Sequence, residues 1–387
     1  ALVMVFALAT TAFAADTTIT APSGSTRTYD VYQIFTGDLA GDVLSNVKWG
    51  KNGTGTVGKA VPQATLNALA AVNSLSNTEK LAEISKYVKP DSEKFGTVSD
   101  GSPLTAPTGY YLIKDNGPVG DGEAYSLYVV QVVGLTTISP KVGTTTSEKK
   151  VDDKNDSNNT QDEVTWEDSA DYDIGDDVPF QLKATIAQDY DNYKVYKLTF
   201  HDKESAGLTF KPKTVVVKID DTTVDSSKYE VVTTGLTDGD TFEVRFANLK
   251  STAAHAGSVI TVEYSSTLND QAVLGSTGNP NTMHITYSNN PNDDQGGENG
   301  KTPDDTVIVF TYKVVANKVT KNPAYVEGGS ESEYIPLKGA GFTLYKKNAS
   351  GEYVAVGSEV KGEEMTTFEW KGLDDGDYKI VETTPPA

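Results

Sequence analysis

The stretch "VYKLTFHD", residues 195–202, alternates apolar and polar side chains in a pattern typical of a β-strand. Successive side chains of a strand point to opposite faces, so Tyr196, Leu198 and Phe200 share one face with Asp202. Further segments of the same kind, separated by turn residues, lie between residues 177 and 288: "DVPFQLKATI", "TVVVKID", "TFEVRFANL", "SVITVEYSSTL" and "MHITYS". Short strands separated by turns predict a β-sandwich.

The rest of the chain falls into blocks on either side of this sandwich. With 387 residues, the chain is long enough for two or three domains. Residues 15–141 form a predicted N-terminal domain that mixes strands with one helical stretch at 63–88, and the middle domain follows at 142–290. A Pro-, Gly- and Asp-rich linker is predicted at 291–305, before a third domain at 306–387 that is truncated. We therefore expect an all-β chain of tandem sandwiches, with some helix in the first.

The composition excludes several classes of function. A formal net charge of −21 argues against nucleic acid and anionic membrane surfaces as partners, because both are polyanions. The chain has no cysteine and only three widely spaced histidines, which excludes thiolate chemistry and makes a histidine-based catalytic site unexpected. The acidic segment at 152–163 lacks the spacing and the glycine of a calcium-binding loop, so we interpret it as a solvated loop. No metal or cofactor is expected.

The N-terminus carries an export signal. The apolar run "ALVMVFALATTAFA" ends in Ala12-Phe13-Ala14, the small-x-small pattern of a signal-peptidase site. We interpret residues 1–14 as the remnant of a signal peptide, with cleavage between Ala14 and Ala15. The alternative is a short membrane anchor, although the run is too short to span a bilayer. The sequence therefore predicts a secreted protein.

Several ionisable or amide side chains share the apolar face of a predicted strand. In "SEKKV", Lys149 lies on the face of Val151, and in "NTMHITY", Asn281 lines up with Met283. In the third domain, Lys318 extends the apolar face of "FTYKVVANK", and Glu382 shares the face of its apolar neighbours in "YKIVE". Inward charges are costly unless they are paired or neutralised. The alternative for each residue alone is a strand end whose side chain reaches back to water.

Inward lysine, acid and asparagine side chains also suggest a reaction. Burial disfavours the ammonium form of a lysine, and the neutral amine can attack the carboxamide of an asparagine. A buried carboxylic acid can polarise that carbonyl group and carry protons, so that ammonia leaves and an amide crosslink remains. A link that closes a loop as long as a domain stabilises by roughly 5 kcal/mol on the loop-entropy argument used for disulfides. Such links would compensate for the missing cysteines.

The chain resembles the backbone pilins of Gram-positive bacteria over most of its length. The resemblance is carried by these segments: "ADYDIGDDVPFQLKATI", "FHDKESAGLTF", "VEYSSTLNDQAV", "TYSNNP", "PLKGAGFTLYKK" and "TTFEWKGLDDGDYKIVETTPPA". The last segment contains a match to the pilin E-box, Tyr-x-Leu-x-Glu-Thr-x-x-Pro, in which isoleucine replaces leucine: Tyr378, Ile380, Glu382, Thr383 and Pro386.

This resemblance implies an elongated chain of Ig-like domains of the collagen-adhesin type, each able to hold a Lys–Asn isopeptide bond. By position, it implies a bond between Lys149 and Asn281 that Asp202 assists. In the third domain it implies that Lys318 is the reactive lysine and Glu382 the E-box acid, with the partner asparagine beyond Ala387. No Lys/Asn pair stands out in the N-terminal domain.

The resemblance also gives a role to Lys141, which follows Ser139 and Pro140 at the end of the N-terminal domain. In the pilin family, a lysine after a Tyr-Pro pair accepts the preceding subunit from a class C-type sortase, and subunits join head to tail. Here serine replaces the tyrosine and the upstream tryptophan of the motif is not evident. The alternative is a solvent-exposed linker lysine. An LPxTG-like sorting signal and anchoring to the Gram-positive cell wall are implied as well.

We therefore interpret the chain as the major shaft subunit of a sortase-assembled pilus that supports adhesion. Its partners would be identical subunits, the sortase and a host surface ligand. The alternative is a monomeric wall-anchored adhesin or tip pilin built from the same domains. An enzyme is not expected, because paired carboxylates such as Asp176 and Asp177 point to opposite faces of a strand and no nucleophile–base set accompanies them. Self-crosslinking would be a single-turnover reaction.

Overall fold

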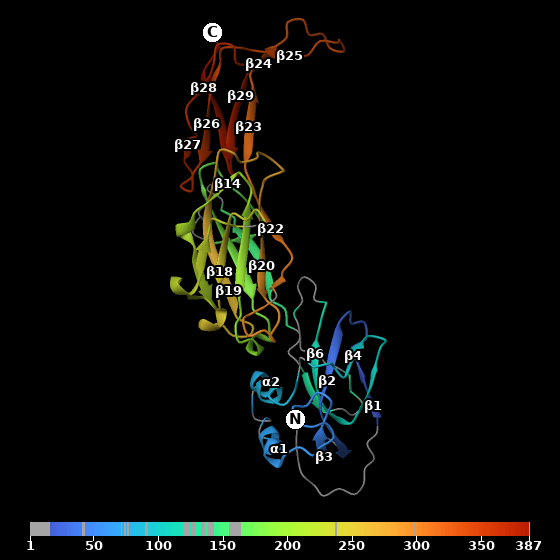
Figure 1. Cartoon of the computed structure of the whole chain (residues 1–387). Coiled ribbons are helices and arrows are strands. Elements are labelled where there is room, and N and C mark those ends of the chain that lie inside the picture. Colours follow the sequence, from blue (N-terminus) through green and yellow to red (C-terminus); the bar gives the residue numbers. More distant parts are fainter. Residues whose placement is uncertain are drawn as a thin grey trace.

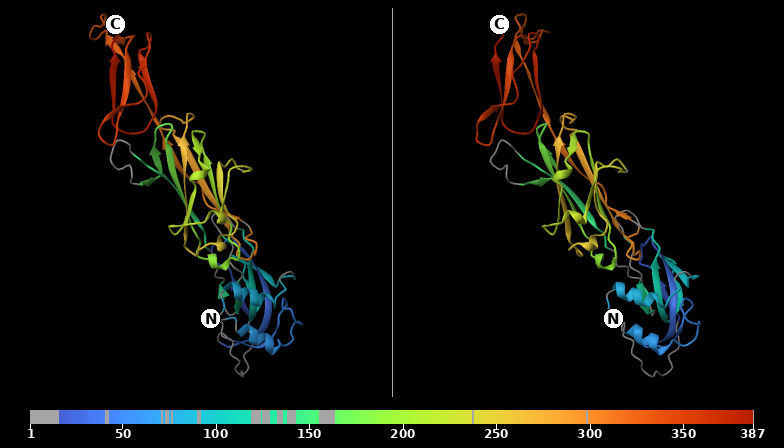
Figure 2. Two further views of the ribbon diagram at one scale, coloured as in Figure 1. Left: turned by 90° about the vertical axis from the view of Figure 1, so that its left-hand side faces the viewer. Right: turned by 60° about the vertical axis from the view of Figure 1, so that its left-hand side comes forward.

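The chain forms domains that follow one another along an elongated molecule (Figure 1). A computed structural model describes residues 16–386 with the exception of residues 41–42, 71, 73–74, 76, 90–91, 119–123, 125–128, 133–135, 138–142, 155–163, 237 and 298. The N-terminal domain lies at one end, the middle domain follows, and the third domain lies at the other end, as two further views also show (Figure 2). The predicted architecture of tandem β-sandwich domains is confirmed.

The N-terminal domain combines two sheets with two short helices. One sheet has the order β3-β2-β6-β7 with β4 on β2, and the other has the order β5-β1-β8. Its strands are β1 (Asp16–Thr20), β2 (Thr28–Ala40), β3 (Val43–Trp49), β4 (Gly96–Ser99), β5 (Leu104–Pro107), β6 (Gly109–Asp115), β7 (Val129–Val132) and β8 (Thr136–Thr137). The helical stretch predicted over 63–88 contains two helices, α1 (Gln63–Ala70) and α2 (Asn77–Ser85).

The middle domain is a sandwich of two seven-stranded sheets. The β9 sheet has the order β10-β9-β12-β19-β15-β16, and the β13 sheet has the order β11-β22-β20-β13-β18-β17. The strands of the β9 sheet are β9 (Thr146–Asp152), β10 (Trp166–Glu167), β12 (Asp177–Thr185), β14 (Leu208–Phe210), β15 (Val216–Ile219), β16 (Thr222–Thr223) and β19 (Val259–Leu268). Those of the β13 sheet are β11 (Ser169–Asp171), β13 (Leu198–Glu204), β17 (Glu230–Val232), β18 (Phe242–Phe246), β20 (Asn279–Ser288), β21 (Asn299–Lys301) and β22 (Asp305–Phe310).

Alternating side chains of both sheets form the core of this sandwich. Phe180 of β12 and Val262 of β19 meet Phe200 of β13 and Ile285 of β20, and all four are fully buried. Every second residue of β20 is buried along most of its length, as period-2 alternation requires. The stretch at 195–202 supplies β13 and its inward face, as its sequence predicts.

The boundary between the middle and third domains differs from the sequence prediction. Residues 291–305 were expected to be a linker and 306 the start of the third domain. Instead β21 and β22 pair with β20, and Val307 and Val309 lie fully buried in the core of the middle domain. Strand pairing therefore extends the middle domain to Phe310, and the third domain starts at β23 (Tyr312–Asn317).

The third domain is a small sandwich. Strand β23 pairs with β29 (Thr367–Leu373), and β24 (Val319–Lys321) pairs with β25 (Tyr334–Pro336). The opposite sheet consists of β26 (Gly341–Lys347), β27 (Tyr353–Ala355), β28 (Val360–Lys361) and β30 (Tyr378–Thr384). Leu344 and Phe368 are fully buried between the two layers.

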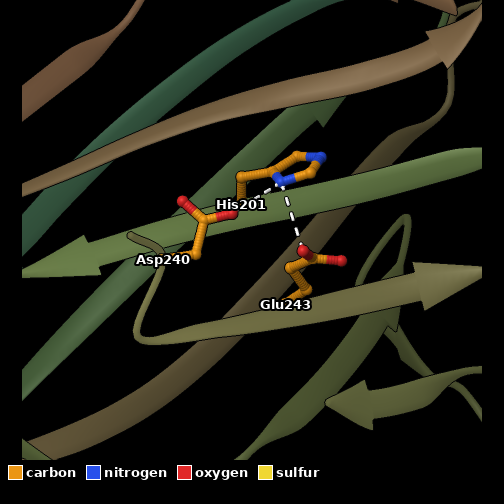
Figure 3. A group of neighbouring side chains, drawn as sticks. All are labelled: His201, Asp240 and Glu243. Carbon is orange, nitrogen blue, oxygen red and sulfur yellow. Dashed lines mark hydrogen bonds and ion pairs between the residues drawn. The ribbon is translucent and has the colours of Figure 1, made fainter. Parts of the chain in front are cut away.

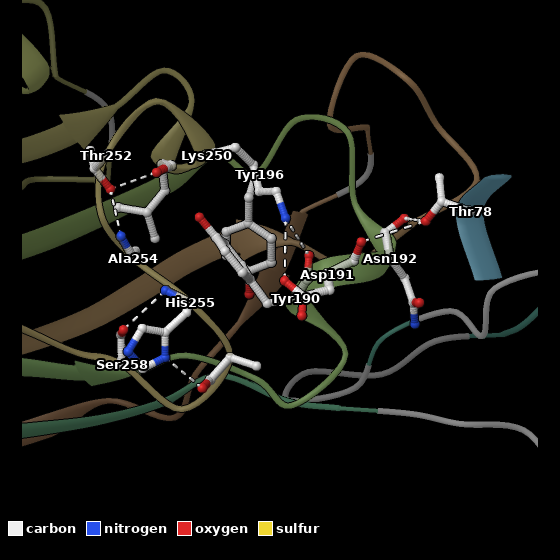
Figure 4. Close-up of polar contacts among 12 residues, drawn as sticks. Thr78, Tyr190, Asp191, Asn192, Tyr196, Lys250, Thr252, Ala254, His255 and Ser258 are labelled. Carbon is white, nitrogen blue, oxygen red and sulfur yellow. Dashed lines mark hydrogen bonds and ion pairs between the residues drawn. The ribbon is translucent and has the colours of Figure 1, made fainter. Parts of the chain in front are cut away.

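Polar contacts join the domains. Between the middle and third domains, the Lys346 ammonium group of the third domain lies 2.9 Å from Asp173 of the middle domain and 2.7 Å from Asp374 of its own domain. Between the N-terminal and middle domains, the Thr78 hydroxyl group at the start of α2 faces the carbonyl oxygens of Asp191 and Asn192, each at 3.5 Å (Figure 4). No helix among the described residues is both long and apolar enough to cross a membrane.

Candidate functional site

Lys149, Asp202 and Asn281 come together in the core of the middle domain. Strand β9 carries Lys149 in one sheet, while β13 and β20 carry Asp202 and Asn281 in the other. All three side chains are 0% exposed. Lys149 lies on the buried face with Val151, and Lys150 points outward to Asp168, as the alternation of the strand predicts. The three residues therefore meet across the interior of the sandwich.

The hydroxyl group of Tyr264 connects these three residues. The Lys149 ammonium nitrogen Nζ lies 2.5 Å from Oδ2 of Asp202 and 3.0 Å from the Tyr264 hydroxyl oxygen. That hydroxyl group donates to Oδ2 of Asp202 at 2.9 Å. It also accepts a hydrogen bond from Nδ2 of Asn281 at 2.8 Å. The amine and the carboxamide nitrogen therefore contact one and the same oxygen atom.

Aromatic rings enclose the cluster. The Lys149 Nζ lies 5.3 Å from the centroid of the Phe180 ring, which stacks on Tyr264 at 5.3 Å. Phe242 packs edge-on against Tyr264 at 4.8 Å. The walls around the amine are thus apolar or aromatic, and such surroundings weaken the hydration on which a charged group depends.

Burial drives both members of the Lys149–Asp202 pair toward their neutral forms. Desolvation lowers the pKa of Lys149 although the neighbouring Asp202 acts in the opposite direction. Desolvation likewise raises the pKa of Asp202, opposed by Lys149. Transfer of one proton from the amine to the carboxylate removes two buried charges at once. The result is a neutral amine next to a carboxylic acid.

A second acid, Glu204, lies at the edge of the same cluster. It faces Asn281 across the pair β13–β20, and Ser266 donates a hydrogen bond to one of its carboxylate oxygens. Burial, followed by the charge of Asp202, raises the pKa of Glu204 to about 7. The oxygens Oδ1 of Asn281, Oδ1 of Asp202 and Oε2 of Glu204 lack a hydrogen-bond partner in the described part of the chain. Unpartnered buried oxygens are costly, which marks this cluster as more than packing.

The sequence analysis missed Tyr264 and Glu204. Both were within reach of the alternation argument, since Glu204 shares a strand face with Asp202, and Tyr264 shares one with the buried Val262. The pattern alone does not single them out, because a tyrosine within a strand and a glutamate at a strand end are both common. Only the three-dimensional arrangement of the strands shows that Tyr264 contacts Lys149 and that the charge of Glu204 acts on it.

The second predicted pair, in the third domain, also comes together. Lys318 follows β23, and its Nζ lies 2.9 Å from a carboxylate oxygen of Glu382 in β30. Their side chains are 22% and 31% exposed, unlike the fully buried pair of the middle domain. The contact therefore joins the two layers of the third domain in a wetter environment.

Other predicted sites lie outside the described residues. These are Lys141, the cleavage site between Ala14 and Ala15, and residues 155–163 of the acidic segment.

Comparisons with known proteins give two family matches. Residues 174–291 match the family described as Gram-positive pilin backbone subunit 2, Cna-B-like domain. Residues 329–387 match the SpaA family, described as a prealbumin-like fold domain. No curated protein matches the chain at a significant level.

Two solved pilin structures illustrate the architecture to which this chain is similar. The T6 backbone pilin of serotype M6 Streptococcus pyogenes is 19% identical, with a TM-score of 0.58 over 97% of this chain and 78% of its own. The full-length major pilin SpaD of Corynebacterium diphtheriae is also 19% identical, with a TM-score of 0.52 over 97% of this chain and 88% of its own. At this level of identity the likeness shows the fold.

Proposed function

Because the chain carries a Gram-positive pilin backbone domain of the Cna-B-like type and a prealbumin-like domain, we propose that it is the shaft subunit of a covalently polymerised pilus. Its fold is that of major pilins, which are structural proteins rather than enzymes. The observation that carries the proposal is the buried cluster in which Lys149 and Asn281 contact one tyrosine hydroxyl group. A pilus shaft bears tension, and a covalent link across the sandwich core resists it.

The proposed crosslink forms within the folded middle domain. The Lys149 ammonium group first transfers a proton to Asp202, which becomes a carboxylic acid. The neutral Nζ then attacks Cγ of Asn281, and the acid polarises the carbonyl oxygen on which negative charge develops. The bond between Cγ and Nδ2 breaks, and Nδ2 leaves as ammonia after it gains the proton that Nζ loses. One amide bond replaces another, and Asp202 ends the reaction as a carboxylic acid that holds the proton taken from the Lys149 ammonium group.

Tyr264 is suited to carry the proton between the two nitrogens. Its oxygen accepts hydrogen bonds from Nζ of Lys149 and from Nδ2 of Asn281, so it contacts the atom that loses a proton and the atom that gains one. In this role the hydroxyl group gives its proton to Nδ2 while it takes one from Nζ. Burial raises the pKa of Tyr264 well above its ordinary value, so the hydroxyl group keeps a proton and releases it only as it takes another from Nζ.

The crosslink would fasten the two sheets of the middle domain to each other. Lys149 lies near the beginning of the domain in the β9 sheet, and Asn281 lies near its end in the β13 sheet. Closing a loop of this length removes conformational freedom from the unfolded chain and stabilises by roughly 5 kcal/mol. In the third domain, Lys318 and Glu382 are proposed to be the lysine and the acid of a second bond.

Assembly would use a different lysine. We assign Lys141 as the amine that accepts the preceding subunit from a sortase, which holds that subunit as a thioester. The lysine nitrogen bonds to the thioester carbonyl carbon and the sortase thiol leaves. A proline fixes its own φ angle, so a proline directly before the lysine would stiffen this segment. The finished polymer would be secreted, anchored to the Gram-positive cell wall, and able to support adhesion to a host surface.

Sortase-catalysed assembly tests the shaft role. The chain, extended by a C-terminal sorting signal, is incubated with a pilus sortase and separated by size under denaturing conditions. We expect a ladder of high-mass products with the native sequence and with Lys197→Ala, a control at an exposed lysine of the middle domain. Lys141→Ala should abolish the ladder. A ladder that persists in this variant would exclude Lys141, and a native chain that stays monomeric would favour the wall-anchored adhesin instead.

A further inference from the structure

One imidazole and two carboxylates meet on the outer face of the β13 sheet (Figure 3). The ring nitrogen Nδ1 of His201 lies 2.9 Å from Oδ2 of Asp240 and 3.6 Å from Oε1 of Glu243. Although these side chains point away from the core, they are only 16%, 5% and 4% exposed. The chain thus holds two nearly buried carboxylates close to the same nitrogen atom.

The backbone fixes all three side chains. His201 of β13 is paired directly with Glu243 of β18. Asp240 ends the turn before β18, in which Asp238 and Gly239 both adopt positive φ angles of 60° and 78°. Strand pairing and a tight turn therefore set the cluster before any ligand arrives, which is the preorganisation that ion binding needs.

Neighbouring groups orient the ligand atoms. Nε2 of His201 lies 2.9 Å from the Thr286 hydroxyl oxygen, and Arg245 donates to the second oxygen of Glu243. Metal-binding histidines regularly donate their other ring N–H in this way, which fixes the tautomer. With Nε2–H donated to Thr286, the lone pair of Nδ1 faces the two carboxylates. Three electron-pair donors then face one another, and a metal ion between them makes this arrangement favourable, as a proton on Nδ1 also would.

We propose that His201, Asp240 and Glu243 bind a divalent transition-metal ion of the zinc class. Such ions take imidazole and carboxylate ligands at about 2.0–2.2 Å, and tetrahedral angles then place the ligand atoms about 3.4 Å apart. The observed separations from Nδ1 of 2.9 Å and 3.6 Å bracket this value. Calcium instead requires about six to eight oxygen ligands, more than this cluster offers. Water would complete the coordination of a zinc ion.

The other groups around the cluster are compatible with a bound cation. The His284 ring stacks on His201 with centroids 4.5 Å apart, on the same outer face of the β13 sheet. Asp304 faces His284 at 3.3 Å and also pairs with Lys301 at 3.5 Å. The ion would join β13, β18 and the turn before β18 on the face opposite the crosslink, and this site does not depend on the pilus role.

Zinc binding to the untagged, metal-free chain tests this site. Titration calorimetry should detect one Zn²⁺ per native chain, and Co²⁺ in its place should give the visible absorption of a tetrahedral site. His201→Gln and Asp240→Asn should each weaken Zn²⁺ binding at least tenfold. His255→Gln is the matched control, because this exposed histidine also pairs with an aspartate, and it should bind Zn²⁺ as the native chain does.

Thermal unfolding of each variant without metal shows whether it is folded, and Zn²⁺ should raise the Tm of the native chain and of His255→Gln only. A native chain that binds no Zn²⁺ would overturn the proposal, because a proton on His201 then suffices to hold the two carboxylates. Equal binding by His201→Gln and the native chain would also overturn it and place the ion elsewhere.

Discussion

The hydroxyl group of Tyr264 contacts both nitrogen atoms that exchange a proton in the proposed crosslinking reaction. It also donates to Asp202, so the acid, the amine and the amide are joined through one side chain. An aromatic ring at this position has a second role, because it stacks on Phe180 and helps to desolvate Lys149. The two roles can be separated, since phenylalanine retains the ring and loses the hydroxyl group.

Tyr264→Phe should therefore fold but form the isopeptide bond at least about tenfold more slowly, because general acid–base groups contribute this much or more. Chains isolated unfolded and unlinked are refolded, and the linked fraction is followed by mass spectrometry over time. Tyr196→Phe is the control, since this buried tyrosine of the same domain loses only its hydrogen bond to Thr145. Equal rates for Tyr264→Phe and the native chain would exclude the proton-transfer role and leave the crosslink itself untouched.

At the scale of strands, the alternation of side chains predicted which residues face the core, but not which strands lie side by side. Lys149, Asp202 and Asn281 are buried as their strand faces predict. Their contact with Tyr264 depends on how the strands of each sheet are paired and on how the two sheets are packed. No local sequence pattern specifies either arrangement.

The end of the middle domain was missed for the same reason. The run "TVIVFTYKVV" reads as continuous strand, yet β22 ends at Phe310 in one domain and β23 begins at Tyr312 in the next. Hydrogen-bond partners change between the two strands, while the apolar pattern continues. Sequence alone therefore places the domains but not the residue at which one passes into the other.

The joint between β26 and the middle domain depends on one lysine. The Lys346 side chain is 12% exposed and lies between Asp173 and Asp374, which raise its pKa against the effect of burial. Removal of this cation takes away the ammonium group that lies 2.7 Å from the nearly buried carboxylate of Asp374. Lys346→Met should therefore destabilise the third domain by about 3 kcal/mol.

Urea unfolding followed by the fluorescence of Trp370, in the core of the third domain, measures this effect. The other two tryptophans, Trp49 and Trp166, are replaced by phenylalanine in every chain compared. Lys371→Met is the control, because the side chain of Lys371 is 57% exposed and its pair with Glu369 should contribute little. Equal urea midpoints for Lys346→Met and Lys371→Met would show that the stability of the third domain does not depend on Lys346.

At the scale of the whole molecule, the stability of the joint between the middle and third domains should depend on pH. Burial, followed by the charge of Asp375, raises the pKa of Asp171 from 3.8 to about 6. A carboxyl group that binds its proton more tightly in the folded state stabilises that state at low pH. This stability is lost as pH rises from about 4 through 6.

Asp171→Asn removes this titration, so its Tm should increasingly exceed that of the native chain between pH 4 and 6. The gain should reach a few degrees and then stay constant. Asp270→Asn, at an exposed loop position, should follow the native chain at every pH. A difference between Asp171→Asn and the native chain that does not change with pH would contradict the assignment.

The proposed role in a pilus shaft depends on the covalent bond between Lys149 and Asn281. The intact mass of the folded chain tests this bond most directly. We predict a mass lower by one ammonia than the mass of the sequence, together with one joined peptide pair that contains both residues after digestion. Asp202→Ala should retain the full mass, because the acid that accepts the lysine proton is gone. A native chain with the full sequence mass and no joined peptides would contradict the account.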